Sequence, residues 1–410
     1  MKKGNLRRAW QDVRSNRFAS DSRESREEVK AFDKEAENGI ERIYRALLHK
    51  RFRFQPVRGV TLPRTGKKPR AIIVAPVPDR IVLRSLLLVL QDQASVTKTL
   101  SNPYSFGGVP NKGVRDAIEA ACRAVKSGAK YYLKSDISNF FPSIRREDAL
   151  DKLRLGLPDS TIDTFLDEAT RVELENLSKL TMADQKLFPS ENLGVGQGCC
   201  LSPLLGNVLL KDFDLGMNSF GVACFRYVDD FLILGPDFHT VWEAFELAQT
   251  ELADLGMKTY HPDDGSGKAS HGPTSKGFEY LGCVVSPGFV QPSRQSRQKL
   301  LEKIAKLFDR SSAYFRGISG GLEPAFDASL VGTLSQVHQL VYAWGHQYSF
   351  CNCEALFRAL DKKIDKLIAR YIRAYDTFKH GGNPQAVRRL LGAHLLADSK
   401  SDPILPLSKK

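Results

Sequence analysis

Two adjacent carboxylates, Asp229 and Asp230, stand between two short apolar runs in Phe225–Leu234. Aromatic and β-branched residues in these runs predict two strands with the acidic pair at the turn between them. Asp136 ends another such run, about ninety residues earlier. Three carboxylates on neighbouring strands would hold a pair of Mg²⁺ ions, because Mg²⁺ takes hard oxygen ligands and keeps positions for substrate phosphates. Such a pair stabilises both the attacking and the leaving oxygens of an in-line phosphoryl displacement.

Each acid also has an ordinary structural interpretation. Asp-Asp is common turn chemistry, and an Asp between a strand and a helix, like Asp136, often caps the helix. The catalytic interpretation therefore depends on whether the rest of the chain supplies a nucleotide pocket.

Two further segments have the composition of such a pocket. Val60–Val74 predicts a hairpin with a basic tip, where Lys68 and Arg70 would hold phosphates, because the guanidinium fork matches phosphate oxygens. Gly194–Pro203 is a glycine-rich loop whose backbone could approach a flat ligand closely. A solvated basic turn and an ordinary loop remain the alternatives.

The charge balance indicates a polyanionic partner. The 410 residues carry a formal net charge of +13, and 42% are hydrophobic, enough for a sizeable core. In residues 287–410 Lys and Arg outnumber Asp and Glu by 19 to 10. One predicted helix there has a basic face, which would grip a duplex backbone or simply be solvated; its residues are Lys362, Lys366, Arg370 and Arg373. Together these parts define a template-directed nucleotidyl transferase.

Cysteine usage and hydropathy favour a soluble cytoplasmic protein with reduced thiols. The seven cysteines include no CxxC pair, and only His346, Cys351 and Cys353 form a faint metal-like cluster. The longest apolar run, Ile81–Leu90, is interrupted by Arg84 and is too short to span a bilayer. We therefore expect no membrane association.

Five segments, in order, resemble the motifs of bacterial reverse transcriptases of the group II intron and retron lineage, over roughly residues 40–285. They are the fingers hairpin through Arg70 with Asp79-Arg80, the first palm motif Asp136–Ile144, the Gln-Gly…Ser-Pro motif Gly196–Pro203, the Tyr-x-Asp-Asp box Tyr227–Asp230, and the primer grip Phe278–Gly282. The resemblance rests on all five motifs and on their order along the chain.

The resemblance implies an α+β, right-hand polymerase fold with fingers, an antiparallel palm sheet with helices, and a C-terminal helical thumb. The expected divisions are an N-terminal helical extension at 1–39, fingers at 40–130, a palm at 131–285 with insert elements at 155–193, and a basic thumb at 286–410.

The same resemblance assigns roles to single residues. Asp136, Asp229 and Asp230 would be the catalytic metal ligands, with the carbonyl of Ile137 as an extra ligand. Phe141 would be a steric gate whose ring excludes a ribose hydroxyl.

Further roles follow from it for the substrates. Gln197 would line the nucleotide pocket, and Lys68 and Arg70 would contact the triphosphate. Lys268 would be the general acid for the leaving pyrophosphate, with Lys258 as its rival, since Lys268 has an insert-like setting. The primer grip would comprise Tyr280, Leu281 and Gly282.

The implied activity is RNA-directed DNA synthesis from dNTPs with two Mg²⁺ ions, or Mn²⁺ in their place. No DNA-binding or nuclease module and no retron-type Val-Thr-Gly signature is recognisable after residue 285. The chain is therefore most similar to compact, stand-alone phage-defence reverse transcriptases, which implies a structured non-coding RNA as template and an antiviral role. Three alternatives stay open: protein-primed or template-independent DNA synthesis, RNA-dependent RNA synthesis, and RNA binding or splicing assistance by a vestigial palm.

Overall fold

The computed structural model describes residues 2–16, 23–64, 67–318, 326–381 and 384–394. The chain forms two compact units, Met1–Lys276 and Gly277–Lys410. Thr65 and Gly66 of the predicted hairpin, and parts of the predicted N-terminal extension and thumb, lie outside the described residues.

The first unit is built around an antiparallel sheet with the order β4-β5-β3-β6, in which β7 also pairs with β3. Its strands are β3 (Tyr131–Ser138), β4 (Ala223–Tyr227), β5 (Asp230–Gly235), β6 (Lys258–Thr259) and β7 (Ser270–Pro273). β3 is longer than predicted, because Ile137 and Ser138 continue the ladder by pairing with β6. Asp136 therefore lies inside the strand rather than at its end.

Helices cover both faces of this sheet. Phe231, Leu232, Ile233 and Leu234 are all buried, although alternate residues of a strand point to opposite faces. The helices that contact the sheet are α6 (Val114–Lys126), α12 (Lys211–Met217) and α13 (Phe238–Asp254).

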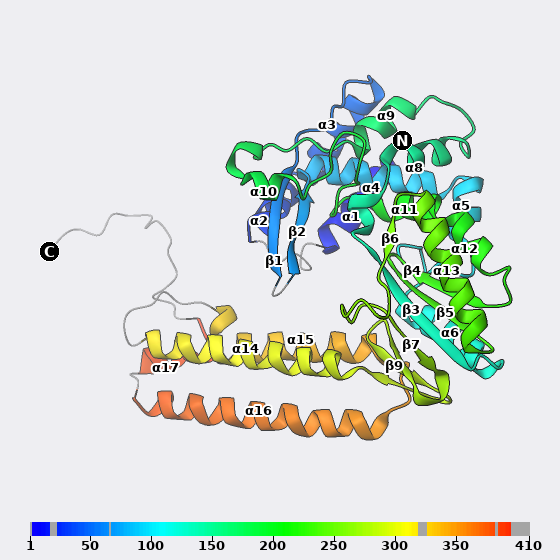
Figure 1. The fold of residues 1–410 in the computed structure, drawn as a ribbon. Helices are drawn as coiled ribbons and strands as arrows, with labels where there is room; N and C mark the ends of the chain where they lie inside the picture. Colours follow the sequence, from blue (N-terminus) through cyan, green and yellow to red (C-terminus); the bar gives the residue numbers. More distant parts are fainter. Residues whose placement is uncertain (1, 17–22, 65–66, 319–325, 382–383, 395–410) are drawn as a thin grey trace. The chain divides into compact units, whose positions relative to one another are not determined.

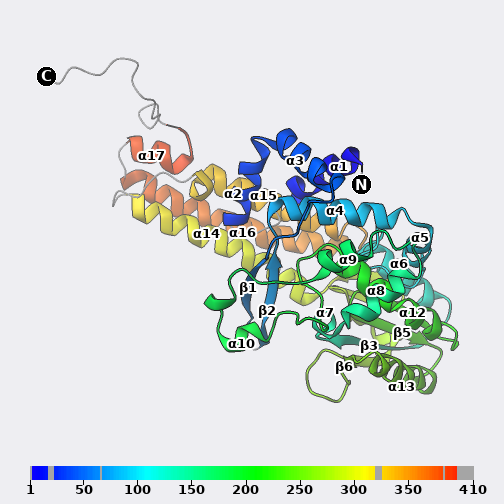
Figure 2. The same ribbon diagram turned by 90° about the horizontal axis from the view of Figure 1, so that it is seen from above.

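The predicted basic hairpin is present as β1 (Arg58–Arg64) and β2 (Lys67–Val74), which pair antiparallel. A small core joins it to the segment 155–193, where Phe188 packs with Val57 and Ile73. Figures 1 and 2 both show α10 (Met182–Gln185) beside the hairpin. The segment predicted as an insert therefore supports the strand that carries Arg70.

The other helices of the first unit pack in two cores, one shared with β3, β4 and β5 and the other formed by α1, α2, α3 and α4. They are α1 (Lys3–Ser15), α2 (Arg23–Asp33), α3 (Ala36–Leu48), α4 (Val77–Gln91), α5 (Ala94–Leu100), α7 (Phe140–Ser143), α8 (Arg146–Arg154), α9 (Asp163–Thr170) and α11 (Ser202–Leu209), with 3₁₀ turns η2 (Leu177–Lys179) and η3 (Thr274–Lys276).

The second unit joins a three-stranded sheet, in the order β10-β9-β8, to a set of helices. Leu300, Ile304 and Phe308 of one helix pack with Ile364 and Tyr371 of another, as the helical spacing predicts. Its elements are β8 (Phe278–Tyr280), β9 (Cys283–Ser286), β10 (Phe289–Pro292), α14 (Arg294–Ile318), η4 (Phe326–Ala328), α15 (Leu330–Gln347), α16 (Glu354–Gly381) and α17 (Pro384–Leu391).

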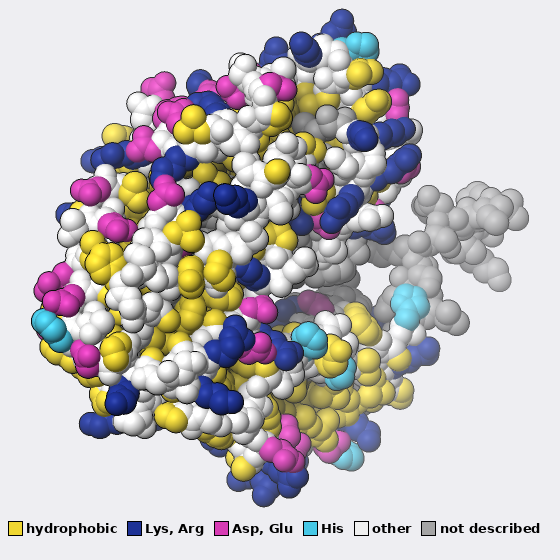
Figure 3. Space-filling view, turned by 90° about the vertical axis from the view of Figure 1, so that its right-hand side faces the viewer, with side chains coloured by type: hydrophobic (Ala, Val, Ile, Leu, Met, Phe, Trp, Pro, Cys, Tyr) yellow, Lys and Arg dark blue, Asp and Glu magenta, His cyan; other side chains and the backbone are white. Residues whose placement is uncertain are grey.

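Basic, acidic and apolar side chains are interspersed on the face that Figure 3 shows. The net charge of the chain is therefore not gathered into one patch there. Among the described helices, none combines the length and the apolar character needed to cross a membrane.

Candidate active site

Three acidic side chains meet where β3 lies beside the hairpin of β4 and β5: Asp136 is on β3, Asp230 begins β5, and Asp229 lies in the turn between β4 and β5. Asp136 of β3 pairs in register with Asp230 of β5, and the backbone N–H of Ile137 donates to the carbonyl of Asp229 at 2.8 Å. Each acid offers one carboxylate oxygen, and these three atoms all lie within 4.8 Å of one another. In the part of the chain that the structure describes, this is the one such group of three acidic, His or Cys ligands, so His346, Cys351 and Cys353 form no comparable cluster.

The negative charges of the three carboxylates repel one another. Burial, the charge of Asp136 and its hydrogen bond raise the pKa of Asp229 to about 6. Burial and the charges of Asp136 and Asp229 raise the pKa of Asp230 to about 7. Asp230 is the most exposed of the three acids. Repulsion by the other two carboxylates is therefore the main physical cause of its raised pKa. A carboxylate cluster of this kind favours a bound cation.

Lys268 supplies one positive charge to the cluster. Its ammonium group forms an ion pair with Asp136 Oδ2 and lies 5.2 Å from the centre of the Tyr260 ring. Burial lowers the pKa of Lys268, but the hydrogen bond and charge of Asp136 outweigh it and raise that pKa. The structure thus brings the predicted general acid to the triad, whereas Lys258 lies exposed in β6.

The donor set fits a divalent metal. All three side chains offer hard carboxylate oxygens, which suit Mg²⁺ or Mn²⁺ rather than a soft metal. The carbonyl of Ile137, the predicted extra ligand, follows Asp136 directly on β3. The triad can therefore hold a metal ion.

Two predicted nucleotide-binding residues meet although 127 positions separate them. Arg70 Nε donates to Gln197 Oε1 at 2.8 Å, and the N–H of Ile73 donates to the carbonyl of Gln197 at 2.7 Å. Gly198 has φ +111°, and a Cβ there would collide with the carbonyl of Ile73. Lys68 is exposed on β2, two residues before Arg70 and on the same face.

Phe141 lies in the short helix α7, which follows β3. Its side chain is half-buried, and its ring centre is 5.2 Å from that of Phe140. The carbonyl of Phe141 accepts a hydrogen bond from the N–H of Val195 at 3.0 Å, which ties the helix to the glycine-rich loop two residues before Gln197.

The remaining predicted site residues belong to the second unit. Tyr280 ends β8, and Leu281 and Gly282 form its turn to β9 with φ +47° and +78°. The basic residues Lys362, Lys366, Arg370 and Arg373 are all exposed on α16. Their assigned roles at the primer and the nucleic-acid backbone stay predictions.

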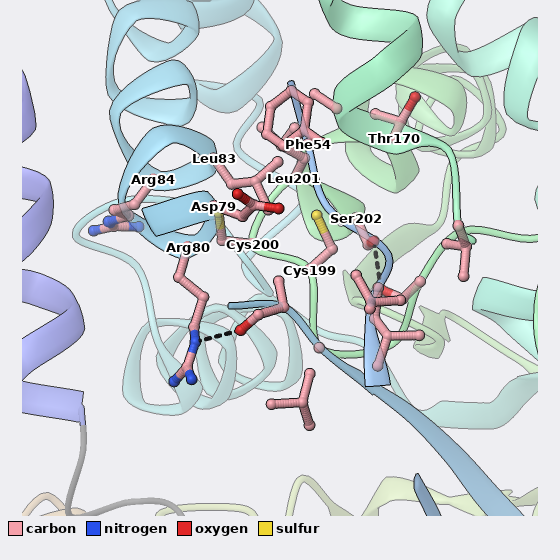
Figure 4. Close-up of a pocket in the computed structure, with 18 of the residues that line it drawn as sticks. Phe54, Asp79, Arg80, Leu83, Arg84, Thr170, Cys199, Cys200, Leu201 and Ser202 are labelled. Atoms are coloured by element: carbon pink, nitrogen blue, oxygen red, sulfur yellow. Dashed lines mark hydrogen bonds between the residues drawn. The ribbon is translucent and has the colours of Figure 1, made fainter. Parts of the chain in front are cut away.

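The first unit contains a cavity of about 580 Å³, and Figure 4 shows residues that line it. It is lined by the glycine-rich loop, including Cys199 and Leu201, and by Asp79 and Leu83 of α4. Asp79 accepts a hydrogen bond from the N–H of Gln55 at 2.7 Å, and burial raises its pKa to about 6. None of the three acids lines this cavity, so it is not the place of the metal chemistry.

Sequence reasoning missed a buried ion pair that reaches the turn of the acidic hairpin. Arg226 is a fully buried charge in the strand before the acidic pair, and its partner Asp214 is buried as well. A charged residue inside an apolar strand was the available signal.

A comparison with protein families decides the identity of the chain. The family model described as "Reverse transcriptase (RNA-dependent DNA polymerase)" matches residues 62–285, more than half of the chain. The chain belongs to the reverse transcriptase family. Its fold is accordingly the α+β, right-hand polymerase fold that the motifs predicted, with fingers, an antiparallel palm sheet and a helical thumb.

Curated relatives of this reverse transcriptase match it in part. Protein YkfC of Escherichia coli (strain K12) is 25% identical over 163 residues, which cover 39% of this chain and 40% of YkfC. The group II intron-encoded protein LtrA of Lactococcus lactis subsp. cremoris is 23% identical over 208 residues, which cover 50% of this chain and 32% of LtrA. The matched parts thus span well under half of these relatives' lengths.

Solved structures add similarities of low score. A telomerase from Candida albicans in complex with a fragment of telomeric RNA has a TM-score of 0.41 and 12% identity, with 83% of this chain and 61% of that chain covered. A partial Cas6-RT-Cas1–Cas2 complex has a TM-score of 0.32 and 19% identity, with 60% of this chain and 42% of that chain covered. The family assignment rests on the sequence match instead.

Proposed function

We propose that this reverse transcriptase adds deoxynucleotides to a primer 3′ end along an RNA template, with two Mg²⁺ ions held by Asp136, Asp229 and Asp230. The convergence of three carboxylate oxygens within 4.8 Å of one another carries this proposal. The family match supports the polymerase class.

When bound, the two ions would stabilise the attacking and leaving oxygens of the displacement. Asp136 would be held by the ladder between β3 and β5, and Asp229 by the hydrogen bond from the N–H of Ile137, so that little reorganisation precedes the reaction. The Lys268 ammonium, already beside the triad, would donate a proton to an oxygen of the departing pyrophosphate.

The other site residues would bind and select the nucleotide. Arg70 and Lys68 would neutralise the triphosphate from β2, and the hydrogen bond to Gln197 would orient the Arg70 guanidinium. Phe141 would present its ring to the sugar and exclude a 2′-hydroxyl. The exposed basic face of α16 would bind the template–primer backbone, which predicts binding that weakens steeply with salt.

Primer extension with purified full-length protein tests the proposal. We expect labelled dNTPs to be added to a DNA primer on an RNA template with Mg²⁺. The Asp229→Asn/Asp230→Asn double variant should lose roughly 1,000-fold or more in rate, because it lacks two of the carboxylates that would stabilise the transition state through the metal ions. Activity that persists in this variant would refute the site. Addition of rNTPs at the dNTP rate would instead favour an RNA polymerase.

Two further readouts address the alternatives. A product that enters a gel only after proteinase treatment would show that DNA synthesis begins on a residue of the protein. RNA binding and a cellular phenotype that both survive in the double variant would favour a binding or splicing-assistance role.

The finer proposal is that the template is a dedicated, structured non-coding RNA and that the product serves antiviral defence. It rests on the sequence resemblance to compact defence-associated reverse transcriptases. Sequencing the RNA and cDNA that co-purify with the protein tests it, since one enriched RNA with matching cDNA is expected and a random RNA population would contradict it. Loss of phage resistance in cells that carry the double variant tests the antiviral role.

A further inference from the structure

Arg226 forms a buried ion pair with Asp214 in the strand that leads into the acidic hairpin. It lies in β4, three residues before Asp229, with 1% of its surface exposed. Its Nε and Nη2 donate to the two carboxylate oxygens of Asp214, each at 2.7 Å. Nη2 also donates to Ser105 Oγ and Asn207 Oδ1 at 3.0 Å. The guanidinium is thus held rigidly in one orientation.

The remaining nitrogen of this guanidinium reaches the turn of the hairpin. Arg226 Nη1 donates to the carbonyl of Val228 at 2.9 Å. That carbonyl belongs to the peptide bond that leads directly into Asp229. The orientation of a buried side chain thereby fixes the backbone next to a metal-ligand candidate.

Val228 adopts a conformation that its side chain disfavours. Its φ is +61°, in the left-handed region where a β-branched residue is a genuine outlier. Outliers of this kind persist only when the surrounding structure holds them in place. The hydrogen bond from Arg226 is one such restraint.

A second restraint comes from the loop that precedes α6. The backbone of Arg226 exchanges hydrogen bonds with this loop, as its N–H donates to Tyr104 at 2.8 Å and its carbonyl accepts from Phe106 at 3.0 Å. Gly107 then passes so close that a Cβ there would lie 2.6 Å from the backbone nitrogen of Val228. The turn is enclosed by Gly107 and by the guanidinium.

We propose that Arg226, oriented by Asp214, is a positioning residue that holds Val228 in its left-handed conformation and so places the Asp229 carboxylate for metal binding. A buried ion pair is a poor source of stability compared with apolar residues of the same volume, so stability alone is a weak reason for this network. The metal part of this inference rests on the proposed function. The part that concerns the turn does not.

The central variant is Arg226→Lys, which keeps the positive charge. One ammonium cannot bond both oxygens of Asp214 and also reach the carbonyl of Val228, because it lacks the planar fork of arginine. The matched control is Arg146→Lys. Arg146 is 3% exposed and bonds Asp167 and Glu147 at 2.7 and 2.6 Å, but it lies in α8 and has no bond to the hairpin.

The first measurement is Mn²⁺ affinity of the full-length protein, from the free Mn²⁺ signal in electron paramagnetic resonance. We expect Arg226→Lys to weaken binding about tenfold or more, as the loss of a positioning partner does at other metal sites. Arg146→Lys should leave the affinity unchanged. Equal affinities for wild type and Arg226→Lys, or equal losses in the two Lys variants, would overturn the proposal.

The second measurement reads the turn without metal. The N–H of Ile137 donates to the carbonyl of Asp229, so its hydrogen exchange reports whether the turn keeps its place. Arg226→Lys should speed this exchange about tenfold relative to Arg146→Lys, and an unchanged rate would refute the positioning role. Should wild type and Asp229→Asn/Asp230→Asn bind Mn²⁺ alike, the proposed function fails, while the exchange rate still decides the role of Arg226.

A rescue variant tests the route through Val228. Glycine adopts positive φ without strain, so Val228→Gly removes the need for a restraint on the turn. The double variant Arg226→Lys/Val228→Gly should recover most of the lost Mn²⁺ affinity. No recovery would show that Arg226 does not act through Val228.

Discussion

Lys268 forms an ion pair with Asp136, although 132 positions separate the two residues. The loop that carries Lys268 leads into β7, and β7 pairs with β3, the strand of Asp136. The pairing of β7 with β3 thus places a basic residue that is distant in sequence beside the acidic triad. In a site with three carboxylates, this lysine is a counter-ion, and the proposed function uses its ammonium group as the proton donor.

We expect Lys268→Ala to slow nucleotide addition about 100-fold, at the lower end of the effect of a general acid. Presteady-state extension in Mg²⁺ measures the rate of the chemical step. Lys258→Ala is the control, because Lys258 is exposed in β6. Should the Lys258 variant be the slower of the two, the rival lysine is the acid.

The raised carboxyl pKa values predict how the stability of the metal-free protein depends on pH. Asp230 has a pKa of about 7 in the folded chain, against about 3.9 when unfolded. Between these values the folded state binds a proton that the unfolded state has lost. The free energy of unfolding attributable to Asp230 therefore falls as pH rises from about 4 to 7.

Asp230→Asn should flatten this dependence. Urea denaturation in EDTA at pH 5 and pH 7.5 measures it, and Asp254→Asn, an exposed acid at the end of α13, is the control. If the free energy of unfolding depends on pH equally in wild type and Asp230→Asn, the pKa of Asp230 is not raised by charge repulsion. Mg²⁺ should oppose the loss of stability at the higher pH, because a metal ligand must be deprotonated to bind.

The sequence predicted the elements that local patterns determine. The two strands around Asp229 and Asp230 and the basic hairpin were recognisable from short apolar runs and turn residues, and the structure confirms them. The predicted helix with a basic face is also present, as α16.

The contacts between distant segments could not be predicted in the same way. The setting of Lys268 is polar and glycine-rich, which locally indicates a loop, and only the pairing of β7 with β3 brings it to Asp136. Arg226 was hidden because its partner, Asp214, lies on α12, where an acid ordinarily faces solvent. The length of β3 was underestimated because its last residues pair with a two-residue strand.

Phe141→Ala should relax the choice of sugar. Without the ring, a ribose 2′-hydroxyl would no longer be excluded, so the ratio of kcat/KM for dNTP to that for rNTP should fall at least tenfold. Phe140→Leu is a suitable control because the Phe140 ring is buried against Gly206. It should lower stability and leave the ratio unchanged. An unaltered ratio in Phe141→Ala would remove the gate assignment.

The hydrogen bond between Arg70 and Gln197 predicts that the two residues act as a unit on the nucleotide. Gln197→Ala frees the Arg70 guanidinium, and Arg70→Ala removes the triphosphate contact that Gln197 orients, so each should raise the KM for dNTP about fivefold. The double variant should be little worse than Arg70→Ala alone, which corresponds to a coupling of about 1 kcal/mol.

Lys68 offers the matched cycle for this pair. It lies on the same face of β2, but its assigned contact with the triphosphate does not involve Gln197. Lys68→Ala and Gln197→Ala should therefore have additive effects on KM, within about 0.5 kcal/mol. Additive effects of Arg70→Ala and Gln197→Ala would instead mean that the bond across 127 positions does not persist once a nucleotide is bound.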